Sequence, residues 1–292
     1  MSATIGAALR EAVRCLEAHH IPEAGPAAEI LLADLLAVTR PHLYFDAHRP
    51  LRTTHQELYT SRIKRRLRGE PVQYIMGRQE FWSLEFEVNP HVLIPRPESE
   101  LLVEHGICCV HQWRKTRGEL PLEILDVGTG SGNLAISLAY ALPQSRVTGI
   151  DIAVGALQVA QRNGQRLGVA ERLTWIGGDL LTPLRPDCRH FALCVGNLPY
   201  IATAEWEQLP REIREYEPST ALLAGEHGLD CIQRLVIASP GVLTPQGTLL
   251  LEVGWQQAAA VINIIRHCGH FQEAGVFRDF AGIERVVWAR MS

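Results

Sequence analysis

After residue 121 the chain alternates between short apolar runs and longer amphipathic segments, and this alternation limits its possible folds more than any other feature. The apolar runs predict strands at Leu122–Val127, Arg146–Ile150, Leu173–Ile176, Phe191–Val195, Thr248–Val253, Glu273–Phe277 and Glu284–Ala289. The segments between them predict helices at Asn133–Leu142, Gly155–Leu167, Leu229–Ala238 and Gln256–His267. Strands that alternate with helices form an α/β fold, so residues 99–292 are expected to build a doubly wound, mostly parallel sheet.

Residues 1–78 lack this alternation and predict a small helical-bundle domain. The apolar side chains of a first helix share one face, made of Ile5, Leu9, Val13 and Leu16. A second helix is expected at Ala27–Val38. A third is expected at Gln56–Arg68, with an apolar face made of Leu58, Ile63 and Leu67. This third helix also carries a basic cluster, which we interpret as a solvated face rather than a partner-binding patch: Arg62, Lys64, Arg65, Arg66 and Arg68.

Between these two regions, residues 79–98 predict a hairpin linker. Apolar and polar side chains alternate from Phe81 to Val88, which is typical of two short strands, and the turn is expected near Ser83. Pro97 and its acidic neighbours then predict the start of a helix that runs to about Trp113. Residues 114–120 are polar, and we expect a loop there.

Composition and charge exclude several classes of protein. A chain of 292 residues is long enough for two domains, each with its own core. The net charge of −4 argues against a protein that grips nucleic acid along its backbone, because such proteins are usually basic. No apolar stretch is long enough to span a bilayer, and the first twenty residues lack the apolar core of a signal peptide. The seven cysteines have no metal-binding spacing, so we expect buried free thiols, no metal site and a cytoplasmic location.

A glycine-rich loop follows the first strand of the expected sheet and precedes a helix. Its residues are Gly128, Thr129, Gly130, Ser131 and Gly132. Glycines let the backbone bend tightly and approach a ligand closely, which is typical of nucleotide-binding turns. The spacing from Gly130 also fits the loose dinucleotide fingerprint, so NAD and S-adenosylmethionine both remain open on this feature.

Acidic residues end the next two expected strands. Asp151 stands where an acid commonly binds the ribose hydroxyls of a nucleotide. Asp179 can accept a hydrogen bond from an adenine amino group, and the neighbouring Leu180 can pack on the ring. The alternative is that each aspartate caps a helix or closes a turn. We favour ligand binding, because ligands of such sheets bind at the carboxyl ends of the strands.

The tetrapeptide Asn197–Tyr200 follows the fourth expected strand. The Asn197 side-chain oxygen and the Leu198 carbonyl can accept the two hydrogens of a planar NH2 group, and Tyr200 can cover its face. Pro199 restricts Leu198 to extended conformations. This arrangement suits methylation of an amide or amino nitrogen, with Asn197 and Tyr200 as the catalytic candidates. The alternative for Tyr200 is a core tyrosine at the end of a strand.

Several motifs occur in an order that resembles the PrmC/HemK family. They are Gly69–Gly77, Glu80–Trp82, Leu93–Glu98, the glycine loop, Asn197–Tyr200, Glu217–Pro218, Gly225–Leu229 and Leu251–Gly254. The Leu93–Glu98 run together with the helical first domain is specific, whereas many methyltransferases share the glycine loop. The resemblance covers nearly the whole chain, and it departs from the family at Leu198, where proline is usual.

The resemblance implies a Rossmann-like class I methyltransferase domain preceded by a helical substrate-recognition domain. It implies S-adenosylmethionine as methyl donor and S-adenosylhomocysteine as product, with the glycine loop, Asp151, Asp179, Leu180 and Asn197 at the cofactor. The implied partners are class I peptide chain release factors, without membrane or direct nucleic-acid binding. Their Gly-Gly-Gln glutamine would be methylated on its amide nitrogen N5 while bound by Asn197, Leu198, Pro199 and Tyr200.

Two other functions stay open. A nucleic-acid adenine-N6 methyltransferase would use the same tetrapeptide chemistry on a flipped base, although the acidic net charge argues against it. A non-catalytic binding module that kept the fold would be consistent with Leu198. For Arg96 and Glu98, a capping or structural role and a contact with the ligand are equally open.

Overall fold

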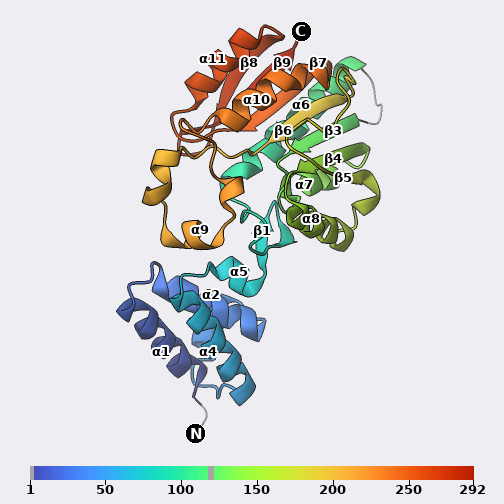
Figure 1. Ribbon diagram of the computed structural model, residues 1–292. Helices are drawn as coiled ribbons and strands as arrows, with labels where there is room; N and C mark the ends of the chain where they lie inside the picture. Colours follow the sequence, from blue (N-terminus) through green and yellow to red (C-terminus); the bar gives the residue numbers. More distant parts are fainter. Residues whose placement is uncertain (1–2, 118–121) are drawn as a thin grey trace. The chain divides into compact units, whose positions relative to one another are not determined.

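The computed structural model describes residues 3–117 and 122–292 (Figure 1). The chain divides into two compact units. The first contains the residues up to Arg78 together with Pro210–Tyr216, and the second contains Gln79–Leu209 and Glu217–Ser292. The short segment Pro210–Tyr216 therefore belongs with helices that precede it by more than a hundred residues, which the sequence does not predict.

Helices make up the first unit: α1 Ile5–Ala18, α2 Ala24–Leu36, α3 Arg40–Phe45, α4 Thr53–Leu67, α5 Val72–Met76 and α9 Arg211–Tyr216. Thr4 begins α1, since its hydroxyl accepts a hydrogen bond from the Ala7 backbone N–H at 3.2 Å. The core lies mainly between α1 and α2, where Leu16, Leu31 and Leu32 are fully buried. The sequence misses α3, α5 and α9 because helices of five or six residues are too short to show a period.

The predicted apolar and basic faces of α4 are both wrong in part. Leu58 is 54% exposed, and the helix instead buries Tyr59, whose hydroxyl donates to the Ala28 carbonyl at 2.9 Å. Arg66 was assigned to a solvated face, but it is only 5% exposed and forms an ion pair with Glu212 of α9 at 2.6 Å. A buried arginine needs such a partner, and its partner lies too far along the chain to be read from the local pattern.

The predicted hairpin is present in the second unit. Its strands are β1 Arg78–Phe81 and β2 Leu84–Glu87. Trp82 and Ser83 form the turn with φ values of 54° and 56°, the left-handed pair that a two-residue hairpin turn requires. Glu100 fixes this turn, because its side-chain oxygen accepts the Trp82 backbone N–H at 2.7 Å.

A seven-stranded sheet forms the centre of the second unit, in the order β5-β4-β3-β6-β7-β9-β8. Its strands are β3 Leu122–Val127, β4 Ser145–Asp151, β5 Leu173–Gly177, β6 Phe191–Gly196, β7 Leu243–Glu252, β8 Phe271–Arg278 and β9 Glu284–Met291. The first five are parallel neighbours, while β9 runs antiparallel to both β7 and β8. The prediction of a mostly parallel sheet is confirmed.

Helices cover both faces of this sheet (Figure 1). They are α6 Glu100–Arg117, α7 Asn133–Ala141, α8 Val154–Arg166, α10 Asp230–Ala238 and α11 Ala258–Cys268. One apolar core joins α6 and α7 to strand residues such as Ile124, and the other joins α10 and α11 to alternate residues such as Leu125. The helix α6 continues to Arg117, so the loop predicted at 114–120 is wrong for its first four residues, and its remainder lies outside the described residues.

The order of the strands creates a switch point between β3 and β6. From β3 the chain adds β4 and β5 on one side, and it then returns to add β6 and β7 on the other. In the register of the sheet, Val127 at the end of β3 pairs with Gly196 at the end of β6. The glycine loop and the tetrapeptide Asn197–Tyr200 therefore begin beside each other, at the place where sheets of this kind bind ligands.

All seven cysteines are free. Of the seven, Cys194 is buried, Cys108 and Cys188 are exposed and the other four are half-buried, so the expectation of buried thiols is confirmed for Cys194 alone and is wrong for the two exposed ones. Over residues 3–117 and 122–292, no helix has both the length and the apolar character needed to cross a membrane.

Candidate active site

A cavity of about 370 Å³ opens at the carboxyl ends of β3, β4, β5 and β6. Its volume lies within the range usual for small-molecule sites. Most of the residues predicted for the site line it: Gly128, Thr129, Gly130, Ser131, Asp151, Asp179, Leu180, Asn197, Leu198 and Pro199. Gly132 and Tyr200 are not among its lining residues.

The glycine loop has the backbone geometry that its sequence predicts. Gly128 and Gly130 have φ values of 74° and 55°, which side chains rarely tolerate. A Cβ placed on Gly130 would meet no atom closer than 4.0 Å, so this part of the loop faces open space. Gly132 differs, because a Cβ there would come within 2.9 Å of Ile136, and its role is packing at the start of α7.

Asp126, the penultimate residue of β3, was not predicted as a site residue from the sequence. It is fully buried and holds the loop through one oxygen, which accepts the Thr129 hydroxyl at 2.5 Å and the Ala135 backbone N–H at 3.2 Å. Within residues 3–117 and 122–292 its other oxygen has no hydrogen-bond partner. Burial raises the pKa of Asp126 to about 7. Its place directly before a glycine loop was the signal that could have found it.

Asp151 has the turn-closing role that the sequence left open, and it also lines the cavity. Its carboxylate closes a turn by accepting the Ala153 backbone N–H at 2.8 Å, and it accepts the Gly130 backbone N–H at 2.8 Å from the loop. Burial raises its pKa, and these backbone hydrogen bonds lower it. Because Asp151 also lines the cavity, its remaining lone pairs can receive hydroxyl groups of a ligand.

Asp179 lines the same cavity but is already paired with a cation. One of its oxygens accepts from the Arg234 guanidinium of α10 at 2.6 Å, and both side chains are about half exposed. The other oxygen stays available to an amino group. Beside it, Leu180 has a φ of 50°, and one residue, Gly178, separates the pair from the end of β5. The sequence does not predict the partner Arg234, which lies 55 residues away.

In the tetrapeptide, Asn197 and Leu198 are held from different sides. The Asn197 side-chain amide donates from Nδ2 to the Ser99 hydroxyl at 2.9 Å. The Leu198 side chain is only 2% exposed and packs in the core against the glycine loop, so that a Cβ on Gly128 would lie 3.1 Å from its Cδ2. Leu198 thus belongs both to the core and to the lining of the cavity.

Tyr200 is partly buried and packs against the core between the sheet and α10–α11. Its carbonyl accepts the Gln257 side-chain N–H at 2.9 Å, and burial raises the pKa of its phenol. A Cβ on Gly254 would lie 3.1 Å from its ring. The structure therefore supports the core alternative for this side chain, while its predicted contact with an acceptor stays a prediction.

The segment Leu93–Ser99 forms another wall of the cavity. Arg96 pairs with the buried Glu217 carboxylate, which also accepts the Ile94 backbone N–H at 3.1 Å. This pairing joins two motifs that carried the family resemblance, Leu93–Glu98 and Glu217–Pro218. Arg96 lines the cavity, which leaves a contact with a ligand possible for its guanidinium.

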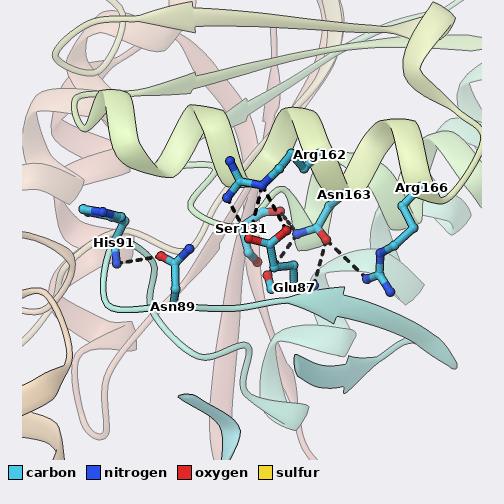
Figure 2. Close-up of polar contacts among 7 residues, drawn as sticks. All are labelled: Glu87, Asn89, His91, Ser131, Arg162, Asn163 and Arg166. Atoms are coloured by element: carbon cyan, nitrogen blue, oxygen red, sulfur yellow. Dashed lines mark hydrogen bonds and ion pairs between the residues drawn. The ribbon is translucent and has the colours of Figure 1, made fainter. Parts of the chain in front are cut away.

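Figure 2 shows how Asn163 of α8 joins the hairpin strand β2 to the glycine loop. Its side-chain oxygen accepts the Glu87 backbone N–H at 2.7 Å, and its nitrogen donates to the carbonyls of Glu87 and Ser131 at 3.1 and 2.9 Å. Arg162 adds an ion pair with the Glu87 carboxylate at 2.7 Å. Asn163 is fully buried and its hydrogen bonds are satisfied, so we assign it a structural role that holds the two segments together.

Comparisons with known proteins agree with this geometry. The model of the PrmC N-terminal domain matches residues 7–77, and a methyltransferase domain model matches residues 124–216. A release factor glutamine methyltransferase of Moorella thermoacetica is 41% identical over 286 residues, with 98% of both chains covered. The one of Chlorobaculum tepidum is 40% identical and covers 91% of this chain and 90% of its own. The chain belongs to the release factor glutamine methyltransferase family. The resemblance to the PrmC/HemK family is thereby confirmed.

Solved structures that are similar to this family member share its fold. The hMettl16 catalytic domain in complex with the MAT2A 3'UTR hairpin 6 matches with a TM-score of 0.57 at 13% identity, over 82% of both chains. The 16S rRNA methyltransferase RsmC of T. thermophilus, in complex with AdoMet and guanosine, matches with a TM-score of 0.50 at 16% identity. This second match covers 74% of this chain and 50% of RsmC. The predicted Rossmann-like methyltransferase fold is confirmed.

Proposed function

We propose that this protein transfers a methyl group from S-adenosylmethionine to N5 of the glutamine in the Gly-Gly-Gln loop of class I peptide chain release factors. One observation carries the proposal: residues 128–131 of the glycine loop and residues 197–199 of the tetrapeptide line a single cavity at the switch point of the sheet. Membership of the release factor glutamine methyltransferase family supports the choice of acceptor.

The groups around the cavity fit S-adenosylmethionine. Gly130 leaves room for a ligand beside the loop, and Asp151 offers carboxylate lone pairs to ribose hydroxyls. Asp179 offers an acceptor for an amino group, and Leu180 offers an apolar surface beside it. When bound, S-adenosylmethionine supplies an electrophilic methyl group on a positively charged sulfur.

On the acceptor side, the residues must compensate for a weak nucleophile, because the lone pair of an amide nitrogen is delocalised into its carbonyl. Asn197 and the Leu198 carbonyl can each accept one hydrogen of the glutamine NH2 group, which fixes the plane of that group. Positioning of this kind can contribute about 7–11 kcal/mol in favourable cases. A strong base is not required, because a methylated and protonated amide loses its proton readily. The tetrapeptide indeed contains no His, Asp or Glu.

Transfer of a labelled methyl group tests the proposal. The full-length protein is incubated with labelled S-adenosylmethionine and, in parallel, with a class I release factor, the same factor with its Gly-Gly-Gln glutamine replaced by alanine, and an adenine-containing RNA. We expect label on the unmodified factor alone. Label on adenine and none on the factor would support the adenine-N6 alternative. Cofactor binding without transfer to any of the three would support a non-catalytic module.

A further inference from the structure

Behind the tetrapeptide, three side chains from distant parts of the second unit form a continuous chain of hydrogen bonds. Asn197, after β6, donates from Nδ2 to the Ser99 hydroxyl at 2.9 Å. Ser99, just before α6, donates in turn to the Glu252 carboxylate at the end of β7 at 2.5 Å. Ser99 is 1% and Glu252 3% exposed, so water does not compete for the bond between them, while Asn197 itself is half-buried. The orientation of the Asn197 amide is therefore determined by buried protein groups.

The Ser99 hydroxyl has a single hydrogen, and this determines which group donates and which accepts in each of the two hydrogen bonds. While Glu252 is ionised it is only an acceptor, so Ser99 gives it that hydrogen and can then only accept from Asn197. Asn197 must present its NH2 end to Ser99, which leaves its oxygen for another partner. An oxygen is the end that a substrate NH2 group requires.

A protonated Glu252 allows the opposite direction. Its carboxyl group can donate to Ser99, and the Ser99 hydrogen is then free to be donated to the Asn197 oxygen. The Asn197 amide would turn over and present its NH2 end toward the acceptor. Two NH2 groups facing each other cannot form a hydrogen bond, so the acceptor would lose one of its two contacts.

We propose that Ser99 and Glu252 are positioning residues that determine which end of the Asn197 amide faces the acceptor, and that protonation of Glu252 reverses this orientation and stops transfer. The inference rests on the proposed function for the identity of the acceptor. The orientation itself is a property of the free protein.

The surroundings of Glu252 place its titration in an accessible range. Burial raises its pKa to about 7, against the opposing effect of the Ser99 hydrogen bond. The charge of Glu98 raises the pKa further, while the charge of Arg285 on β9 and a hydrogen bond from Tyr200 lower it. Arg285 is itself engaged by Asp279 at 3.0 Å. The folded-state pKa therefore lies above the ordinary value, and the ionised, active orientation is expected above about pH 7.

Nuclear magnetic resonance tests the orientation without any substrate. The chain has five asparagines, so selective labelling with 15N gives five side-chain amide signals, and the signal lost in Asn197→Ala identifies Asn197. We expect this signal to shift between pH 6 and pH 8.5 with a midpoint at about 7, and the shift to disappear in Glu252→Gln and in Ser99→Ala. The Asn163 signal is the internal control, because its partners are backbone groups and the guanidinium of Arg166, with no carboxyl group among them.

Single-turnover methylation of a release factor tests the consequence. With both substrates saturating, the wild-type rate is expected to rise with a midpoint at about pH 7, and Glu252→Gln to remove that rise. Ser99→Ala should lower the rate about 10–100-fold. Losses of this size are found at metal sites when a residue that orients a metal-binding side chain is removed. Ser99→Thr keeps the hydroxyl and should recover most of the rate. Glu252 is not among the residues that line the cavity, so Glu252→Gln should leave the affinity for S-adenosylmethionine unchanged.

The two hypotheses fail separately. If the wild type methylates the release factor but the Asn197 signal does not titrate, or Ser99→Ala keeps the wild-type rate, the positioning role is wrong and the proposed function stands. If the Asn197 signal titrates as expected but no release factor is methylated, the orientation is established and the proposed function is wrong. Should Ser99→Ala fail to fold, the wild-type titration and its loss in Glu252→Gln decide the matter.

Discussion

The glycine loop and the tetrapeptide Asn197–Tyr200 lie on neighbouring strand ends but are held in different ways. The loop is held from nearby in the sequence: Gly130 donates to Asp151, 21 residues on, and Asp126 binds the start of α7. The tetrapeptide is held by Ser99 and Gln257, which are 98 and 57 residues away. Contacts between residues close in the sequence thus hold the end of the cavity assigned to the cofactor. Contacts between residues far apart in the sequence hold the end assigned to the acceptor. Substitutions in the glycine loop should change the affinity for S-adenosylmethionine, and substitutions in the tetrapeptide should change the rate of methyl transfer.

The largest expected effect follows from removing the Asn197 side chain. Asn197→Ala should lower the single-turnover methylation rate about 10²–10³-fold, as loss of one preorganised hydrogen-bonding group does at comparable sites. The affinity for S-adenosylmethionine, measured by calorimetry, should stay close to that of the wild type. An equal loss of rate and affinity would mean that Asn197, like the glycine loop, binds the cofactor, and would contradict the proposed difference between the two regions.

A substitution in the glycine loop should have the opposite pattern. Gly130→Val forces a branched side chain onto a φ of 55° and directs it toward the cavity, so it should weaken S-adenosylmethionine binding at least about 10-fold. Gly168→Val is the matched control. Its φ is 73°, a Cβ there meets nothing within 4 Å, and the residue is outside the cavity lining. Equal affinity losses in both variants would assign the effect to strain alone.

A smaller effect is expected at Tyr200, where the ring matters more than the hydroxyl. Tyr200→Ala should raise the KM for the release factor about 3–10-fold, because an aromatic contact contributes about 0.5–1.5 kcal/mol. Tyr200→Phe keeps the ring and should change KM less. Since the ring also packs in the core, urea unfolding of both variants must accompany the kinetics. A change in stability with no change in KM would leave only the core role for this side chain.

The smallest effect on activity is expected when the usual residue of the family is restored at position 198. Leu198→Pro keeps the carbonyl and stiffens the tetrapeptide, so the methylation rate should remain within about threefold of the wild type. The Leu198 side chain is buried against Gly128, however, and proline fills less of that space. The free energy of unfolding should therefore fall by about 1–3 kcal/mol. A large loss of rate in a stable variant would contradict the assigned role of the carbonyl.

The parts of the site that the sequence predicts are those specified by local pattern. The strand ends, the positive φ of Gly128 and Gly130 and the place of Asp151 all follow from a strand, a turn and a helix in succession. Ser99 and Glu252 could not be predicted as partners, because nothing in the sequence near either residue indicates that Asn197 comes within hydrogen-bonding distance of Ser99. Gly132 was assigned to the ligand because it belongs to the glycine-rich loop, and only the packed side chains around it show the different reason for glycine.

The same limit explains the errors in the helical unit. The apolar face of α4 was drawn through Leu58 by spacing alone, while the helix is actually rotated so that Tyr59 reaches the Ala28 carbonyl. Arg66 was counted among exposed charges because its partner Glu212 lies 146 residues away. A buried charge is stabilised by one specific partner, and periodicity contains no information about that partner.

Saturation with S-adenosylmethionine tests most directly whether the two regions have separate roles. Single-turnover rates of release-factor methylation are measured for Asp151→Ala and Asn197→Ala over increasing cofactor concentration. We expect Asp151→Ala to approach the wild-type rate at high concentration, because it has lost affinity alone. Asn197→Ala should stay about 10²–10³-fold slower at every concentration, because it has lost its contact with the acceptor. Recovery of Asn197→Ala by excess cofactor, or a rate of Asp151→Ala that stays low at saturation, would contradict the division of the site.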